Sequence, residues 1–176
     1  MTRLVAVVGP SGAGKDTLMA MACAALPDAR AARRVITRPA GAGGEDFEGV
    51  TDLAFAARVA AEDFALHWQA HGLRYGIPAS ELTGAGTVLF NASRAVLAQA
   101  RREFPDLVVL LVTAPPQVLA ARLAGRGRET APDQAARLAR AGFSLPEGIA
   151  ARVVMNDTTP EDGLARFIAA LQPERV

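Results

Sequence analysis

The segment Gly9-Pro-Ser-Gly-Ala-Gly-Lys15 constrains this chain more than any other, because it fits the pattern G-x-x-x-x-G-K. The apolar, strand-forming run Leu4–Val8 precedes it, and helix-forming residues follow it. Glycines let backbone N–H groups curl around a phosphate, a helix start adds donors, and a lysine ammonium bridges the outer phosphates. The segment therefore predicts a site for ATP. We expect contacts from Gly9, Pro10, Ser11, Gly12, Ala13, Gly14, Lys15, Asp16 and Thr17, with Lys15 catalytic.

Composition supports a special role for Lys15 and excludes several classes of protein. The chain has 176 residues, and Lys15 is its only lysine among 19 basic residues; the formal net charge of +1 does not indicate a nucleic-acid binder. A single cysteine excludes an intrachain disulfide. Charged residues interrupt every apolar run before the length of about 18 residues that a membrane span needs, and the N-terminus does not resemble a signal peptide. We expect a cytoplasmic protein that binds neither membranes nor nucleic acid, and its oligomeric state stays open.

Apolar runs that read as strands alternate with helical segments along most of the chain. This order predicts the α/β P-loop NTPase fold, with a mostly parallel sheet flanked by helices. Thr51 and Asp52 can cap a helix that runs to about Ala61, and a further helix is expected at about 132–141. A hairpin around Gly72 and an irregular Gly-rich stretch interrupt the alternation. We therefore expect one domain, 1–176, with a core of 1–36 and 86–176, an inserted acceptor-binding lobe of about 37–85 and a lid of about 125–131. Ligands should bind at the carboxyl ends of the strands.

The residue after the loop lysine departs from the usual pattern. A Ser or Thr normally stands there and ligates Mg²⁺, but here Asp16 follows Lys15 and Thr17 comes one residue later. One residue turns a helix by about 100°, so the Thr17 hydroxyl should point elsewhere. Asp16 either holds Mg²⁺ through its carboxylate or only complements the positive end of the helix. We expect Mg²⁺ with ATP, with Asp16 as its protein ligand.

Five arginines gather within nineteen residues downstream. Arg122, Arg126 and Arg128 bracket a Gly-containing break, and Arg137 and Arg140 follow. Taken alone, they fit a solvated pair of charged helices equally well. Downstream of a phosphate loop they predict a lid that closes on transferring phosphates, in which Arg126 and Arg128 are catalytic, helped by Arg122 or Arg137. We also expect Arg122 to contact ATP.

Other polar residues are placed to hold a second, phosphorylated substrate. Arg38 opens the inserted lobe, and Tyr75 lies in its hairpin; both residue types bind phosphate. Asn91 and Arg94 follow a buried strand, at an edge where ligands are expected. The substrate-binding residues that we expect are Arg38, Tyr75, Asn91, Ser93, Arg94 and Arg137.

Together these segments resemble the guanylate-kinase-like group of P-loop kinases. The shared elements are Gly9–Lys15, Ile-Thr-Arg at 36–38, Gly44-Glu45, Tyr75-Gly76, Arg122-Leu123…Arg126-Gly127, Arg137-Leu138…Ala141 and Asn156-Asp157, in the family's order. The resemblance implies a core sheet, an acceptor-binding lobe and an arginine lid. It also implies that Asn156 and Asp157 lie near the base of ATP.

Several departures separate the chain from guanylate kinases themselves. One acceptor arginine of the family is missing after Arg38, the position that reads guanine falls near Leu66, and Asn91 replaces a usual acid. With Gly-Lys-Asp at 14–16 and the patterns at 66–76, 91–94 and 126–129, the chain closely resembles the ribose 1,5-bisphosphate phosphokinases. That resemblance implies a small phosphorylated sugar as substrate, which ATP converts to 5-phosphoribosyl 1-diphosphate, in association with phosphonate breakdown.

Two alternatives remain at this stage. A nucleoside monophosphate kinase for GMP shares the fold, but Leu66 cannot accept hydrogen bonds from guanine. A non-catalytic module that binds a phosphorylated protein also shares it, but such a module should lose the phosphate loop, and Gly9–Lys15 is intact.

Overall fold

A five-stranded sheet lies at the centre of the computed structural model, which describes residues 1–39, 41, 45–125 and 142–172. All its strands are parallel, and their order is β2-β7-β1-β8-β9. The strands are β1 (Thr2–Val8), β2 (Ala29–Ala31), β7 (Gly86–Asn91), β8 (Val108–Thr113) and β9 (Arg152–Met155). The helices are α1 (Lys15–Ala25), α2 (Asp52–Ala60), α3 (Arg94–Glu103), α4 (Pro116–Gly125) and α6 (Pro160–Leu171). The predicted parallel sheet flanked by helices is confirmed.

The two faces of the central sheet are buried against different partners. Because side chains alternate along a strand, Val5 and Val7 of β1 face one way, and Ala6 and Val8 face the other. The first pair packs with α1, α4 and α6, and the second with α3, the inserted lobe and part of the segment 142–151. Both faces are apolar because both are covered, as is usual for parallel sheets.

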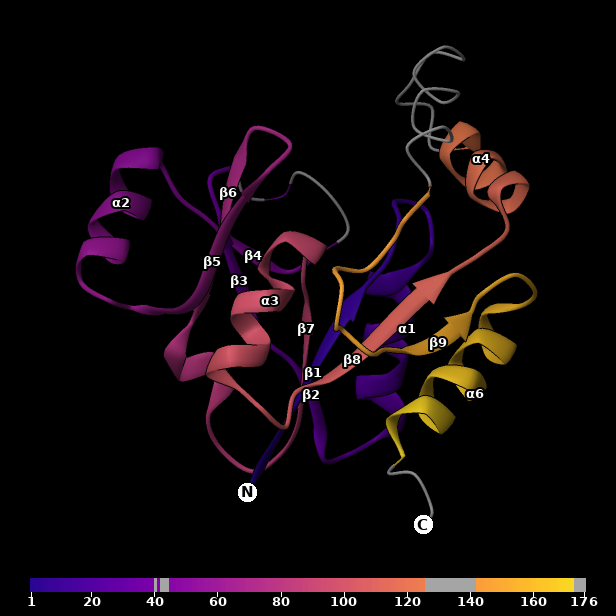
Figure 1. Cartoon of the computed structure of the whole chain (residues 1–176). Coiled ribbons are helices and arrows are strands. Elements are labelled where there is room, and N and C mark those ends of the chain that lie inside the picture. Colours follow the sequence, from indigo (N-terminus) through magenta and orange to yellow (C-terminus); the bar gives the residue numbers. More distant parts are fainter. Residues whose placement is uncertain (40, 42–44, 126–141, 173–176) are drawn as a thin grey trace.

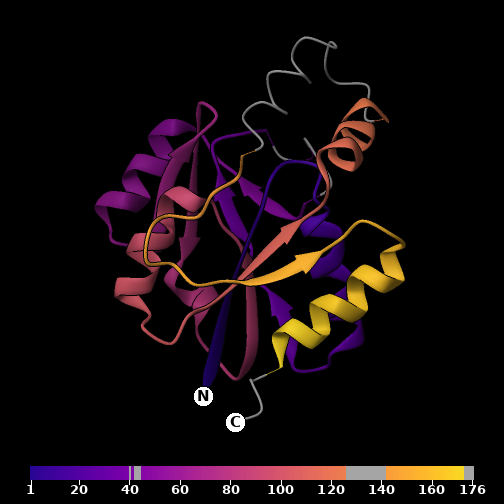
Figure 2. The same ribbon diagram turned by 45° about the vertical axis from the view of Figure 1, so that its right-hand side comes forward.

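The inserted lobe has a sheet of its own, on the opposite side of the central sheet from α4 and α6 (Figures 1 and 2). Its strand order is β4-β3-β6-β5, formed by β3 (Arg34–Ile36), β4 (Phe47–Gly49), β5 (Phe64–Ala70) and β6 (Leu73–Pro78). The short helix η1 (Ala79–Leu82) leads back to the core. His71 and Gly72 both have positive φ, 51° and 74°, as a two-residue turn between antiparallel strands requires. The predicted hairpin around Gly72 is confirmed.

Hydroxyl side chains mark the starts of three helices. The Thr51, Ser93 and Thr159 hydroxyl oxygens accept hydrogen bonds from backbone N–H groups in the first turns of α2, α3 and α6. Such caps satisfy donors that have no partner within the helix. The expected cap of α2 at Thr51 is therefore confirmed.

The expected boundary between core and lobe is wrong at residue 36. We placed 1–36 in the core, but Arg34–Ile36 forms β3 of the second sheet, beside β4 and β6. The core strand after α1 is instead β2, whose sequence Ala-Arg-Ala carries no β signal. Val35 and Ile36 are buried in either arrangement, so their hydrophobicity does not decide which sheet they join. All but the first residue of the expected lid, 125–131, lies outside the described residues, as does the whole helix expected at about 132–141. No helix in the described ranges is long and apolar enough to cross a membrane.

Candidate active site

The phosphate loop joins the central strand β1 to α1, as predicted. Gly9 has φ 152°, and a Cβ there would collide with the carbonyl oxygen of Val112 on the neighbouring strand β8. Gly14, the N-cap of α1, has φ 87°, and a Cβ there would lie 2.6 Å from Asn156 Nδ2. Both glycines are therefore required by the backbone conformation and by close packing. The loop ends at a helix start, where backbone N–H groups favour an anion.

The ammonium group of Lys15 is bound to the loop itself. Its Nζ donates to the carbonyl oxygens of Gly9, at 2.8 Å, and Pro10, at 3.2 Å. These bonds hold the positive charge beside the backbone that is expected to cradle the phosphates. A compact ammonium suits this place, because it makes several short bonds without a fixed plane.

Asp16 and Thr17 are exposed in the first turn of α1. The Asp16 carboxylate is held from the end of β7, because Asn91 Nδ2 donates to Asp16 Oδ1 at 2.6 Å. Asn91 was expected to bind the second substrate. The structure places its amide against the proposed metal ligand, a contact between residues 75 positions apart that the sequence did not predict.

Asn156 supports the phosphate loop from below. Its side chain is 7% exposed, its Nδ2 donates to the carbonyl oxygen of Ala13 at 2.8 Å, and its backbone N donates to Thr113 O at 2.8 Å. Gly14 and Gly163 lie on either side of the amide, and a Cβ on either glycine would collide with it. The sequence places Asn156 near the base of ATP only by resemblance, whereas the structure gives it a bond to the loop backbone.

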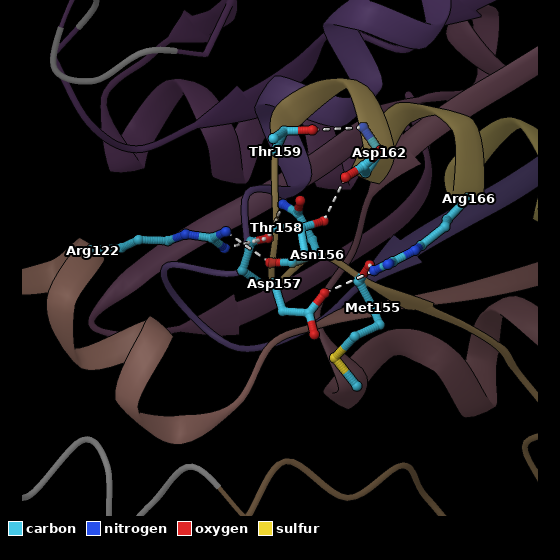
Figure 3. A network of polar contacts seen from close by, with 9 residues as sticks. Arg122, Met155, Asn156, Asp157, Thr158, Thr159, Asp162 and Arg166 are labelled. Atoms are coloured by element: carbon cyan, nitrogen blue, oxygen red, sulfur yellow. Dashed lines mark hydrogen bonds and ion pairs between the residues drawn. The ribbon is translucent and has the colours of Figure 1, made fainter.

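Arg122, in the last turn of α4, also donates to backbone carbonyls (Figure 3). Its Nη2 lies 2.7 Å from Asn156 O, and its Nη1 lies 3.2 Å from Gly12 O and 3.4 Å from Ala13 O. The guanidinium therefore connects α4 to the phosphate loop and to the turn after β9. Its expected contact with ATP remains a prediction.

Asp157 faces away from this support and pairs with Arg166 of α6 (Figure 3). Arg166 Nη1 donates to Asp157 Oδ1 and to the carbonyl oxygen of Met155, both at 2.8 Å. The hydrogen bond from Arg166 is the largest cause that lowers the pKa of Asp157 below its ordinary value. Asp157 therefore carries its negative charge at neutral pH, beside the turn that the resemblance assigns to the nucleotide base.

Arg38 and Tyr75 lie in neighbouring parts of the second sheet. Tyr75 is paired with Ile36 on β3, and Arg38 follows two residues after that position. The Arg38 guanidinium lies over the ring of Phe47, 4.3 Å from its centroid, and its buried Nε has no hydrogen-bond partner in the described part of the chain. Tyr75 stacks on Trp68, with ring centroids 5.5 Å apart and planes 8° apart. The structure therefore brings an arginine with an unsatisfied donor and a stacked tyrosine into one lobe.

Arg34 is a buried charge that sequence reasoning missed. It is 7% exposed, and it donates to both oxygens of Glu45, at 2.6 and 2.5 Å. Its Nη1 reaches the carbonyl oxygen of Asn91 at 3.2 Å, and its guanidinium lies 5.2 Å from the Tyr75 ring centroid. The adjacent Arg33 is exposed and pairs with Asp46. Strand alternation could have separated the two arginines, but only if β3 had been recognised as beginning at residue 34.

The remaining predicted residues divide between α3 and the part of the chain that is not described. Ser93 Oγ accepts from Ala95 N at 3.3 Å as the cap of α3, and Arg94 lies 5.3 Å from the ring centroid of Phe143. Their roles toward a substrate stay predictions. Arg126, Arg128 and Arg137 lie outside the described residues.

The residues present fit a magnesium ion that arrives with a nucleotide. Within the described ranges, no group of three or more His, Cys, Asp or Glu side chains is arranged to hold a metal on its own. Mg²⁺ usually takes one or two carboxylates together with substrate phosphates and water. Asp16 offers one exposed carboxylate beside the loop, which suits that donor set.

Two relatives that align with most of this chain carry the same name. A ribose 1,5-bisphosphate phosphokinase PhnN from Ruegeria sp. (strain TM1040) is 58% identical over 149 residues, which cover 83% of this chain and 78% of that protein. The protein of the same name from Acidiphilium cryptum (strain JF-5) is 53% identical over 175 residues, 96% of this chain and 92% of that protein. A crystal structure of guanylate kinase from Anaplasma phagocytophilum superposes with a TM-score of 0.64 at 16% identity, covering 97% of this chain and 84% of that chain, which shows the fold alone. No family model matches the chain.

Proposed function

The chain belongs to the ribose 1,5-bisphosphate phosphokinase family, and we propose that it transfers the γ-phosphoryl group of ATP to ribose 1,5-bisphosphate, forming 5-phosphoribosyl 1-diphosphate. The observation that carries the proposal is the 58% identity to a protein of that name over most of both chains. The intact phosphate loop, with Lys15 bound across its carbonyls, supports a kinase over a binding module.

The chemistry needs charge and positioning more than proton transfer. The accepting phosphate oxygen is already an anion at neutral pH, so no general base has to create the nucleophile. The obstacle is bringing two polyanions into line. Lys15 and the loop N–H groups hold the β- and γ-phosphates, while Asn156 and Arg122 keep the loop carbonyls turned toward the protein interior. Arg126 and Arg128 of the proposed lid would neutralise the moving phosphoryl group.

The acceptor would bind between the inserted lobe and the strand ends. Arg38 has a buried Nε without a partner in the described ranges, and a phosphate oxygen would satisfy it. Tyr75 adds a hydroxyl from the paired strand, and Arg94 adds a cation from the start of α3. Ser93 and Arg137 complete the proposed set of substrate-binding residues. Asn91 was also expected there from the sequence, but its amide faces Asp16.

Mg²⁺ accompanies ATP in this proposal and would neutralise charge on its phosphates. Asp16 is the protein ligand that we propose for it. Asp16→Ala should raise the Mg²⁺ concentration needed for half-maximal activity, because it removes the carboxylate that lies in the first turn of α1, directly after the phosphate loop. An unchanged Mg²⁺ requirement would contradict this assignment.

A GMP kinase is the main competing activity, because guanylate kinases share the fold. Leu66 counts against it. Its side chain has no polar atom and is fully buried in the core cluster that joins the hairpin to α3, so this position cannot offer a hydrogen bond to a base.

An ADP-release assay with ribose 1,5-bisphosphate, GMP and buffer as alternative acceptors tests the proposal. We expect ADP to form with ribose 1,5-bisphosphate at a rate at least 100 times that with GMP, roughly the discrimination that a missing polar partner produces. Equal or faster turnover of GMP would favour the nucleotide kinase. If ATP bound weakly and neither acceptor released ADP, while phosphopeptides bound tightly, the chain would be a binding module.

A further inference from the structure

Two departures from the usual phosphate-loop pattern meet in space. Asp16 stands where a Ser or Thr is usual, and Asn91, at the end of β7, stands where an acid is usual. They are 75 residues apart in sequence, yet Asn91 Nδ2 lies 2.6 Å from Asp16 Oδ1. A carboxylate can only accept hydrogen bonds, so it is the NH₂ group of Asn91 that faces it.

The two departures compensate for each other chemically. In other phosphate-loop enzymes, a hydroxyl from the helix and a carboxylate from a strand end hold the metal together. Here the helix supplies the carboxylate and the strand end supplies a neutral amide. The corner where the start of α1 meets the end of β7 therefore has one carboxylate in both arrangements. In this chain it belongs to the helix, and in the usual pattern it belongs to the strand.

Asn91 is well placed to orient a partner. Its backbone pairs in register with Val7 of the central strand, and its carbonyl oxygen accepts a hydrogen bond from Arg34 at 3.2 Å. Arg34 is itself held by both oxygens of Glu45. The Asp16 side chain, by contrast, is exposed on the first turn of a helix and has no comparable support from its own element.

We propose that Asp16 and Asn91 are an exchanged pair, in which Asn91 is a positioning residue that directs the Asp16 carboxylate toward the cation bound with ATP. The inference rests on the proposed function for its cation and nucleotide. It gives Asn91 a role that differs from the substrate contact expected from the sequence.

The first test separates positioning from substrate binding. Asn91→Leu removes the donor and keeps the number of heavy atoms and the branching of the side chain. We expect the Mg²⁺ concentration for half-maximal rate to rise about fivefold, the value of one lost contact of about 1 kcal/mol, while the KM for ribose 1,5-bisphosphate stays within about twofold. Gln69→Leu also replaces a side-chain amide with leucine, at an exposed position of β5, and is the matched control. A raised acceptor KM with an unchanged Mg²⁺ requirement would overturn the proposal.

The second test needs no acceptor and no turnover. Calorimetry gives the Kd of ATP with and without Mg²⁺ for the wild type, Asp16→Ser, Asn91→Asp and the double variant. These proteins carry one, zero, two and one carboxylates at the corner. The ratio of the metal-free Kd to the Kd with Mg²⁺ should fall about fivefold in Asp16→Ser, because a charge at about 4 Å in water is worth about 1 kcal/mol. In Asn91→Asp the added charge is offset by the loss of the donor that directs Asp16, so the ratio should stay within about twofold of the wild type.

The double variant decides whether the two residues are exchanged. We expect its ratio to return to within about twofold of the wild type, since the helix then offers a hydroxyl and the strand a carboxylate. A ratio that stays at the level of Asp16→Ser would overturn the proposal. Should the wild type bind ATP but fail to phosphorylate ribose 1,5-bisphosphate, the proposed function would fail, and the four Kd ratios would still test the pair.

Discussion

The phosphate loop and the inserted lobe, the proposed nucleotide and acceptor sides of the site, are held by different kinds of contact. At the phosphate loop, Asn156 and Arg122 donate to backbone carbonyl oxygens. In the inserted lobe, the guanidinium groups of Arg38, Arg34 and Arg74 lie over aromatic rings. Backbone-directed bonds fix the shape of the loop whatever side chains surround it, whereas contacts between side chains change with each substitution. A lobe of this kind can alter its acceptor without disturbing the phosphate loop.

Replacing Lys15 should have the largest effect and should confirm that the loop demands an ammonium. We expect both Lys15→Ala and Lys15→Arg to lower kcat by about 10³-fold, because the arginine fork cannot repeat two short bonds to adjacent carbonyls while contacting phosphate. Steady-state kinetics with ribose 1,5-bisphosphate, alongside a thermal melt to establish folding, is the measurement. Near-normal turnover of Lys15→Arg would contradict the role given to the ammonium.

Breaking the buried Arg34–Glu45 pair should have the next largest effect, a loss of stability of the inserted lobe. Glu45→Ala leaves a mostly buried cation without its partner, so we expect the free energy of unfolding to fall by about 3 kcal/mol. The double variant Arg34→Met/Glu45→Leu removes both charges and should recover most of that loss. Urea denaturation of the two proteins measures this, and equal losses would show that the ion pair itself is not the cause.

Arg38→Met should weaken use of the acceptor without changing the binding of ATP. Loss of a charge-assisted bond to phosphate should lower kcat/KM for the acceptor by about 10- to 100-fold, while the Kd of ATP stays unchanged. Arg74→Met, which removes another arginine stacked on a ring of the lobe, is the matched control. If both variants lose activity equally, the effect belongs to packing of the lobe and not to an anion contact.

Asn156→Ala, in contrast to Arg38→Met, should weaken ATP binding and leave the acceptor unaffected. Because Asn156 donates to the loop carbonyl of Ala13, we expect the free energy of unfolding to drop by about 1–2 kcal/mol and the Kd of ATP to rise, with the KM of the acceptor unaffected. Calorimetric titration with ATP and a denaturation curve provide both values. A change confined to the acceptor KM would contradict the assignment of Asn156 to the nucleotide side.

The smallest effect is expected for Arg166→Ala, on the exposed side of the turn after β9. Arg166 holds the pKa of Asp157 below its ordinary value, so the pair stabilises the fold above the unfolded pKa of about 3.9 and loses that contribution as the pH falls through the lower folded pKa. The melting temperature of the variant should therefore lie slightly below that of the wild type at pH 7, and the difference should shrink in strong acid. A difference that grows on acidification would contradict the pairing.

Local features of this chain are predictable from its sequence, and the choice of neighbour in a sheet is not. The loop between β1 and α1, the Thr51 cap and the hairpin at Gly72 were predictable because their signals lie within a few residues. The strand β2 was missed because Ala-Arg-Ala has no strand preference, and β3 was assigned to the wrong sheet because burial alone does not choose a neighbour. Arg34 and Arg33 look alike in sequence, and only the strand's orientation makes one a buried anchor and the other a surface charge.

The phosphate loop, the alternating fold and the family likeness follow from the amino-acid order, since each depends on spacing along the chain. Contacts between distant groups do not: Asn91 meets Asp16 and Asn156 meets Ala13 across 75 and 143 residues. Such hydrogen bonds depend on strand order and register, and these are set by the packing of the whole sheet. Seven residues predict Lys15 as a phosphate ligand, whereas the contact between Asn91 and Asp16 depends on β7 lying beside β1.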